Sequence, residues 1–179
     1  MNSVQYAATL VNPEYKHVLE FGVFEGYTLG LIREALDDSY KVFGFDSFEG
    51  LPEDWENTVC MKGHFNTNGK IPDIQGVKFF KGWFEDTIPD YLKECDDIAL
   101  LHVDCDLYSS TKTIFKYLHP FIKKDTIIVF DEWRFNEGKN NDHEQKAFYE
   151  YVIEHNVMFT FIDFYDQQNP SDRRIIKIL

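Results

Sequence analysis

A nearly continuous run of apolar residues at 98–103 ends abruptly in two carboxylates, Asp104 and Asp106. The run is too short for most helices and lacks the alternation of a half-exposed strand. This pattern is typical of a central strand in a parallel sheet that is covered on both faces. Open sheets of this kind bind ligands just beyond the carboxyl ends of their strands. We therefore expect the two carboxylates to lie at a ligand-binding edge.

The segments around this strand alternate between strand-like and helix-like patterns. Strands are expected at 17–21, 41–46, 77–80, 98–103, 126–130, 157–165 and 173–179. Such alternation indicates a doubly wound α/β sheet. Only residues 167–171 offer turn material between the last two runs, which is too little for a crossover connection. That pair should therefore form an antiparallel hairpin at the edge of the sheet.

Helices are predicted at 3–11, beyond Gly26, beyond Asp86 or Thr87, beyond Ser109 or Ser110, and around 147–152. The fourth of these has apolar residues at helical spacing, namely Ile114, Tyr117, Leu118 and Phe121. Either serine is expected to cap it, and Pro89 is expected in the first turn of the third helix.

The stretch 60–76 is rich in turn-forming residues and has little periodicity. Its turn formers are Gly63, Asn66, Asn68, Gly69 and Pro72. Loops of this length in compact domains are usually functional or disordered. We therefore consider the stretch a candidate lid over the site.

Composition narrows the class of protein. The 179 residues are 44% apolar and 17% aromatic, which predicts one domain over 1–179. A formal charge of -13 argues against nucleic acid or an anionic membrane as a partner. The cysteines at 60, 95 and 105 have neither disulfide nor zinc spacing. No signal peptide or run of about 18 apolar residues is visible, so we expect a soluble, cytoplasmic protein.

The turn after the first strand has the spacing Glu-x-Gly-x-x-x-Gly, from Glu20 through Gly22 to Gly26. Glycines in such a turn let a ligand approach the amino terminus of the next helix, although they could also merely form a tight turn. Glu20 and Glu25 would repel a pyrophosphate, so a ligand with a positive end fits better. Asp46, at the end of the second strand, is placed to accept ribose hydroxyls or to cap a turn.

Five segments together carry a family resemblance. They are EFGVFEG at 20–26, FDSFEGLP at 45–52, KGWFEDT at 81–87, HVDCDLYSST at 102–111 and VFDEW at 129–133. In this order they resemble the macrocin O-methyltransferase (TylF/MycF-like) branch of class I S-adenosylmethionine methyltransferases, from about residue 18 to the carboxyl terminus. The resemblance implies seven strands in the order 3-2-1-4-5-7-6, with the last antiparallel, and S-adenosylmethionine as cofactor.

By the same resemblance, the turn at 20–26 would line the methionine part of the cofactor and Asp46 the ribose. The segment at 82–84 would lie on the adenine side. The sulfonium group would supply the positive charge that the acidic turn favours. The implied cofactor residues are Glu20, Gly22, Phe24, Gly26, Asp46, Ser47, Phe48, Gly82, Trp83, Phe84 and Asp104.

Four carboxylates are expected at one corner of the sheet, because the strands at 98–103 and 126–130 are neighbours in the implied order, about 4.8 Å apart. These are Asp104, Asp106, Asp131 and Glu132. Either some of them protonate, with a raised pKa, or a cation binds them, and oxygen ligands favour Mg²⁺. The resemblance makes Asp104, Asp131 and Glu132 the ligands. The branch often has Asp-Asp where this chain has Asp131-Glu132, which lengthens one ligand.

Asp106 is the implied general base for an acceptor hydroxyl, with a helix cap as the alternative role. His143, a second catalytic candidate, and Glu144 open the late helix, where they either face the site or are solvated. His102 is expected to be a hydrogen-bonded core histidine. Tyr108 and Trp133 would either wall the acceptor pocket or pack in the core.

The main hypothesis is an S-adenosylmethionine-dependent O-methyltransferase, assisted by Mg²⁺, that acts on a hydroxyl of a small molecule such as a sugar. One alternative is a metal-free methyltransferase in which Asp106 or His143 acts alone. Others are a nicotinamide-dependent oxidoreductase on a similar sheet and a non-catalytic binding module. A homo-oligomer is compatible with the sequence, and nothing in it identifies the acceptor.

Overall fold

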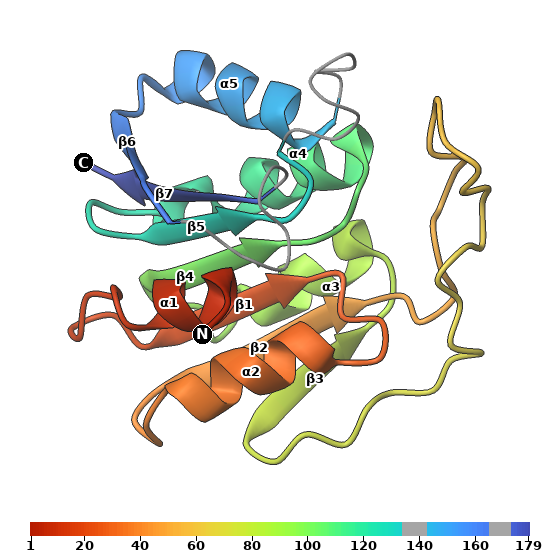
Figure 1. Ribbon diagram of the computed structural model, residues 1–179, viewed down its shortest axis with the longest axis horizontal. Helices are drawn as coiled ribbons and strands as arrows, with labels where there is room; N and C mark the ends of the chain where they lie inside the picture. The colour runs from red at the N-terminus through yellow and green to blue at the C-terminus, as the bar shows by residue number, and fades with distance from the viewer. Residues whose placement is uncertain (134–142, 165–172) are drawn as a thin grey trace.

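The computed structural model describes residues 1–133, 143–164 and 173–179. Within these ranges, seven strands form one sheet in the order β3-β2-β1-β4-β5-β7-β6 (Figure 1). The expected strand order is therefore confirmed. The strands are β1 (His17–Phe21), β2 (Lys41–Asp46), β3 (Val77–Lys81), β4 (Ile98–Val103), β5 (Ile127–Phe130), β6 (Phe159–Ile162) and β7 (Arg174–Ile178).

Strands β1 to β5 pair in parallel, whereas β7 runs antiparallel to both β5 and β6. This confirms the antiparallel pair at the edge of the sheet, although its expected turn at 167–171 lies outside the described residues. The central strands β1, β4 and β5 are buried along their whole length, as the mostly apolar runs of β4 and β5 predict. Their carboxyl ends are therefore held rigidly at one edge.

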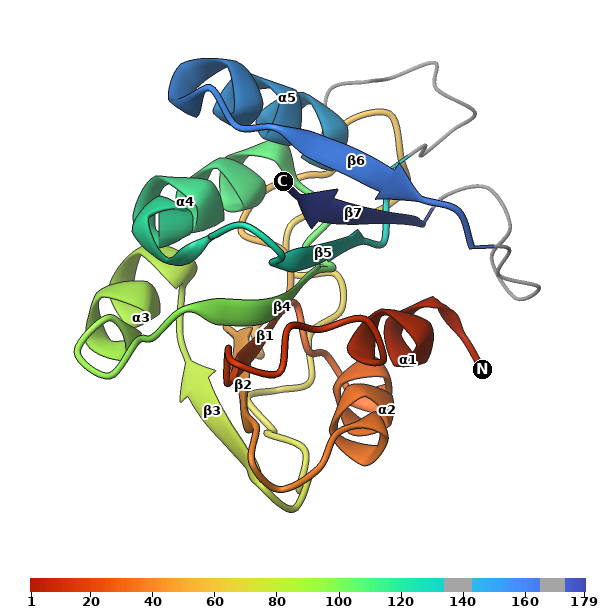
Figure 2. The same cartoon turned by 90° about the vertical axis from the view of Figure 1, so that its left-hand side faces the viewer.

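Helices cover both faces of the sheet (Figure 2). On one face lie α1 (Ser3–Ala8) and α2 (Tyr27–Ala35), and on the other lie α3 (Phe84–Tyr91), α4 (Tyr108–Leu118) and α5 (Glu144–His155). A short 3₁₀ helix (His119–Phe121) continues α4. Each face has its own apolar cluster, around Leu29 and Ile32 under α2 and around Ile114 and Phe115 under α4. No helix in these described ranges is long and apolar enough to cross a membrane.

Three predicted helix boundaries were wrong. Helix α4 begins at Tyr108, with Leu107 at the N-cap and no side-chain cap, because the left-handed backbone of Asp106 (φ 64°) turns the chain earlier than expected. The helix α3 begins at Phe84, which places Pro89 inside the helix and beyond its first turn. The first helix ends at Ala8, three residues before the predicted end.

The candidate lid at 60–76 folds back onto the segment that follows β2. The N–H of Leu51 donates to the carbonyl of His64 at 2.9 Å, and that of Gly69 donates to the carbonyl of Phe48 at 2.8 Å. A Cβ on Gly50 would lie 2.2 Å from the His64 oxygen, so only glycine permits this approach. The stretch is thus packed against the domain, and its role as a lid stays a prediction.

Candidate active site

A cavity of about 760 Å³ opens at the carboxyl ends of the parallel strands. Residues at or just beyond the ends of β1 to β5 contribute to its walls, as is usual for ligand sites of open α/β sheets. Predicted site residues that line the cavity are Gly22, Phe24, Asp46, Ser47, Trp83, Phe84, Asp104, Asp106 and Glu132. The structure therefore brings these residues together, and their individual roles stay predictions.

Other predicted site residues lie outside the described lining of the cavity. Glu20 and Phe48 are completely buried, and Asp131 and His143 are each 7% exposed. The buried Gly26 is the N-cap of α2 in the left-handed conformation, and Gly82 continues from β3 with φ 143°. These residues are not part of the cavity lining.

Gly22 marks the closest approach between the first turn and β4. Its φ is 91°, and a Cβ on it would lie 1.7 Å from the carbonyl oxygen of Asp104. The backbone hydrogen bonds on either side are fixed, since Gly22 N–H donates to Phe45 and Asp104 N–H donates to Phe21. Any larger residue must therefore separate two strand ends that both line the cavity.

Replacing Gly22 by alanine is expected to lower both the free energy of unfolding, by about 2 kcal/mol or more, and the affinity for S-adenosylhomocysteine. Urea denaturation and calorimetry measure the two effects. Gly30→Ala is the matched control, because a Cβ there meets nothing within 4 Å inside helix α2. That variant should gain about 0.5–1 kcal/mol. Equal stability of the two variants would contradict the close approach.

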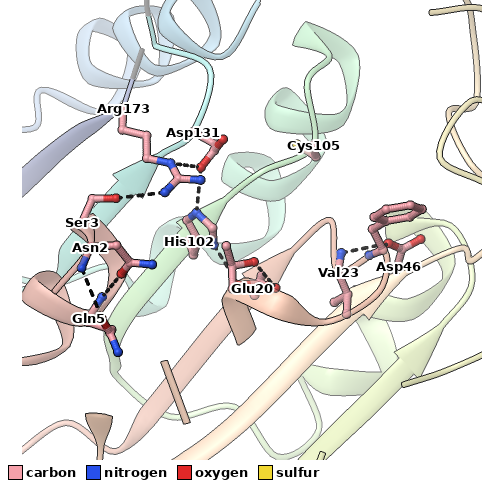
Figure 3. A network of polar contacts seen from close by, with 12 residues as sticks. Asn2, Ser3, Gln5, Glu20, Val23, Asp46, His102, Cys105, Asp131 and Arg173 are labelled. Carbon is pink, nitrogen blue, oxygen red and sulfur yellow. Dashed lines mark hydrogen bonds and ion pairs between the residues drawn. The ribbon is translucent and has the colours of Figure 1, made fainter. Parts of the chain in front are cut away.

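Asp46 shapes the same turn. One carboxylate oxygen accepts the N–H groups of Val23 and Phe24, each at 2.8 Å (Figure 3), and the other accepts the N–H of Phe48 at 2.7 Å. A carboxylate has about four lone-pair positions, so some remain for ribose hydroxyls. Both roles considered for Asp46 are therefore compatible with its geometry.

Aromatic side chains form part of the cavity wall. Phe24, 41% exposed and in a left-handed conformation, meets Phe65 of the candidate lid edge-on at 5.7 Å between ring centroids. Phe84 lies against Phe21 in a similar edge-on contact at 5.0 Å. These faces suit a planar apolar group such as a purine.

Asp106 is 8% exposed and lines the cavity. Burial is the larger cause, and the nearby charge of Asp131 the smaller one, that together raise the pKa of Asp106 to about 7. Burial also raises the pKa of Asp104, and the neighbouring charge of Asp131 adds to this effect. Crowded carboxylates with raised pKa values are the pattern expected of a proton-accepting site.

A row of alternating charges crosses four strands behind the cavity, through Glu20, His102, Asp131 and Arg173 (Figure 3). His102 Nδ1 lies 2.8 Å from Glu20, and its Nε2 faces Asp131 at 3.7 Å. Arg173 forms an ion pair with Asp131. Burial alone would lower the pKa of His102, but contacts with Asp131 and Glu20 outweigh it and raise the pKa to about 10. His102 is therefore the hydrogen-bonded core histidine that was expected.

The group of side chains whose ligand atoms lie close enough to hold a metal ion differs from the expected set of Asp104, Asp131 and Glu132. In the described part of the chain, ligand atoms of His102, Asp104 and Asp131 lie within 4.8 Å of one another. Glu132, half-buried at the cavity wall, is not a member of this group. The sequence missed the place of His102 in the cluster, because a histidine inside an apolar strand gave no sign of which neighbour it would face.

Glu144, for which a position facing the site and a solvated position were both considered, joins the two acidic strand ends. Its carboxylate accepts the N–H of Cys105 after β4 and the N–H of Glu132 after β5, each at 3.2 Å. The side chain is completely buried, and burial raises its pKa well above the usual range. Glu144 thus fixes the first turn of α5 to the edge of the sheet.

The remaining candidates lie around this edge. His143 accepts a hydrogen bond from Trp55 Nε1 at 3.2 Å, and its catalytic role stays a prediction. Trp133 packs against Phe130 and Phe148, which is the core alternative considered for it. Tyr108 donates a hydrogen bond to Glu150 at 2.7 Å.

Comparisons with known proteins agree with this geometry. A family model described as a methyltransferase domain matches residues 19–133. The chain is similar to 8-demethyl-8-(2,3-dimethoxy-alpha-L-rhamnosyl)-tetracenomycin-C 4'-O-methyltransferase of Streptomyces olivaceus, with 24% identity over 156 residues, 74% of this chain and 58% of that protein. It spans a little over half the length of the curated relatives that it matches.

Solved structures share the fold. Calicheamicin methyltransferase CalS11 has a TM-score of 0.75 at 22% identity, covering 97% of this chain and 75% of that chain. An O-methyltransferase from Bacillus cereus, solved in complex with SAH, has a TM-score of 0.64 at 15% identity, covering 98% and 80%. The family match takes in more than half of the chain and the solved structures share its fold, so the chain belongs to the methyltransferase domain family, with the class I fold.

Proposed function

We propose that this protein is an S-adenosylmethionine-dependent O-methyltransferase that acts on a hydroxyl of a small molecule, such as a sugar. The observation that carries the proposal is a single cavity where the Gly22 turn, Asp46 and Asp106 meet, in a chain of the methyltransferase domain family. The named relative from Streptomyces is a 4'-O-methyltransferase of a rhamnosyl compound. We treat residues 1–179 as one catalytic domain.

The cofactor is proposed to lie across the carboxyl ends of β1, β2 and β3. Its methionine part would lie on the Gly22 turn near the amino terminus of α2, and its ribose would lie beside Asp46. Its adenine would lie towards Ser47, Trp83 and Phe84. The fold relative from Bacillus cereus holds SAH, the product form of the same cofactor.

Asp106 is the group that we propose as the proton acceptor. It lines the cavity and its carboxylate accepts no hydrogen bond from the described residues, so it is available to an acceptor hydroxyl. Taking that proton leaves an oxygen able to form a bond with a methyl carbon. S-adenosylmethionine, when bound, supplies this methyl group as its carbon–sulfur bond breaks, and the electron pair stays on sulfur. The walls of the cavity would align the two reactants.

The carboxylate oxygens of Asp104, Asp131 and Glu132 are of the type that Mg²⁺ prefers. Their arrangement, however, does not suit a bound ion. One oxygen of Asp131 already forms an ion pair with Arg173. His102, gathered with Asp104 and Asp131, has a carboxylate at each ring nitrogen, and a doubly protonated ring has no lone pair for a metal. As arranged, these residues do not fit a three-carboxylate site, and the proton transfer proposed above uses no metal. Assays with chelator and with added Mg²⁺ test this point.

The described lining of the cavity favours a neutral or cationic acceptor. It contains seven carboxylates and no lysine, arginine or histidine. The carboxylates are Glu25, Asp46, Glu53, Glu85, Asp104, Asp106 and Glu132. One face of α4 adds the hydroxyls of Ser109, Ser110 and Thr113, which suit a polyhydroxylated molecule. A phosphate group would meet repulsion from this wall.

A neutral sugar is therefore expected to be methylated with kcat/KM at least about tenfold higher than its phosphate ester. The two acceptors differ by one phosphate group, and added salt should narrow the gap between their rates by screening its charge. Mass spectrometry of the products after incubation with methyl-labelled S-adenosylmethionine gives both rates. Faster transfer to the phosphate ester would show that the acidic wall does not select the acceptor.

The proposed activity itself is tested with a broad panel of sugars and glycosides. Transfer of label to at least one hydroxyl is the expected result. A thermal-shift comparison of S-adenosylhomocysteine with NAD separates this function from an oxidoreductase, since only the former should raise Tm. Tight cofactor binding with no transfer across the panel would point instead to a binding module.

A further inference from the structure

We propose that Arg173 takes the place of a metal ion beside Asp131, so that this corner of the sheet excludes divalent cations. This corner adjoins the site of the proposed function, and only the relevance of cation exclusion to methyl transfer rests on that function. Its physical content, the exclusion of a cation, is measurable on the protein without any methyl acceptor.

The register of the sheet places the two residues opposite each other. Strand β7 is antiparallel to β5, and Phe130 is paired with Arg174. One step further along both chains, Asp131 and Arg173 face each other, with side chains on the same face as Ile175 and Val129. The ion pair is therefore a product of strand pairing between two defined elements. It is not a chance contact between long surface side chains.

The ion pair is enclosed. The side chains of Asp131 and Arg173 are only 10% and 16% exposed. Arg173 also donates from Nη1 to the hydroxyl of Ser3 at 3.4 Å, and Ser3 is 1% exposed at the start of α1 (Figure 3). A guanidinium in such surroundings is held in one place and stays charged at any ordinary pH.

Charges along the row already balance without a metal. Glu20, His102, Asp131 and Arg173 alternate in sign across β1, β4, β5 and β7. A divalent ion placed between Asp104 and Asp131 would lie within a few ångströms of the Arg173 guanidinium, where Coulomb repulsion is strong and poorly screened. It would also compete with Arg173 for the carboxylate of Asp131. Arg173 therefore acts as a positioning residue that holds Asp131 in place.

The test is a titration with Mn²⁺, followed by electron paramagnetic resonance and calorimetry, on the protein with S-adenosylhomocysteine bound. The wild-type chain should show no stoichiometric site. Arg173→Met should gain affinity of at least about tenfold, because a unit charge next to the carboxylates is lost. In that variant Mg²⁺ should also raise Tm, by about 3 °C at roughly tenfold its Kd.

Three further variants make the outcome specific. Arg174→Met removes a positive charge from the adjacent residue, whose guanidinium donates to a backbone carbonyl, and should gain nothing. Arg173→Lys keeps the charge and should also gain nothing. Arg173→Gln keeps a hydrogen-bond donor but has no charge. It replaces Arg173→Met in the titration if the methionine variant does not fold, and the same gain in cation affinity is expected.

A stoichiometric Mn²⁺ site in the wild-type chain that is lost in Asp131→Asn would overturn the proposal. So would an uncharged variant at 173 that folds, binds S-adenosylhomocysteine and gains no cation affinity. Absence of methyl transfer from every acceptor would instead count against the proposed function, because the cation titration does not depend on turnover.

Discussion

The Asp106→Asn variant is expected to transfer methyl groups about 10²- to 10⁴-fold more slowly than the wild-type chain, which is the usual contribution of a positioned general base. Its affinity for S-adenosylhomocysteine should be unchanged, because the cofactor is proposed to lie over β1 to β3. Asparagine is preferred to alanine here, since Asp106 has φ 64° and asparagine tolerates the left-handed conformation. Labelled transfer assays and calorimetry measure the two effects.

Glu85→Gln is the matched control, because it also removes one carboxylate from the cavity lining but lies exposed on α3. It should retain most of the activity. Asp106→Ala should be as slow as Asp106→Asn and somewhat less stable, since a residue with a Cβ is strained at positive φ. If Asp106→Asn retained wild-type turnover, the proton would have to go elsewhere, and His143 would become the first alternative to test.

Replacing Glu144 by alanine is expected to lower the free energy of unfolding by about 2–5 kcal/mol, because two buried N–H groups lose their acceptor together. These are the N–H groups of Cys105 and Glu132, which end β4 and β5. The burial cost of the carboxylate, visible in its raised pKa, offsets part of the loss. Urea denaturation measures the difference.

Glu154→Ala, at an exposed position of the same helix, should change the free energy of unfolding by no more than about 0.5 kcal/mol. A similarly small effect for Glu144→Ala would mean that water replaces the lost acceptor. In the expected case the ends of β4 and β5 also loosen, so that affinity for S-adenosylhomocysteine falls together with stability.

Sequence patterns predicted the sheet well because the signals are local. The nearly continuous apolar run at 98–103 and the one predicted at 126–130 are typical of covered strands, and the short interval before the last strand argued against a crossover. The lengths of β2 and β4 agree with the predicted ranges residue for residue. Helix starts were less certain, since the left-handed turn at Asp106 replaced the side-chain cap that Ser109 or Ser110 would have made.

The side-chain partners at the acidic corner could not be predicted in the same way. Pairing of Asp131 with Arg173 depends on the register of an antiparallel strand more than forty positions later in the chain. From the sequence, either protonation or a bound cation was expected to relieve the repulsion between the crowded carboxylates. Neutralisation by an arginine of the same chain could be foreseen only with knowledge of how β7 pairs with β5. For Glu144 the sequence left a position facing the site and a solvated position open, because an acid at a helix start usually lies in solvent.

The contact between Ser3 and Arg173 links the first helix to the acidic corner. Helix α1 is short, capped by the reciprocal hydrogen bonds of Asn2 and Gln5, and packed on β4 and β5. A change in the charge of that corner is therefore expected to alter the stability of α1 through the hydrogen bond between Arg173 and Ser3. The rate of amide hydrogen exchange in the first turn of α1 should therefore report changes in the charge of this corner. The measurement needs no methyl acceptor.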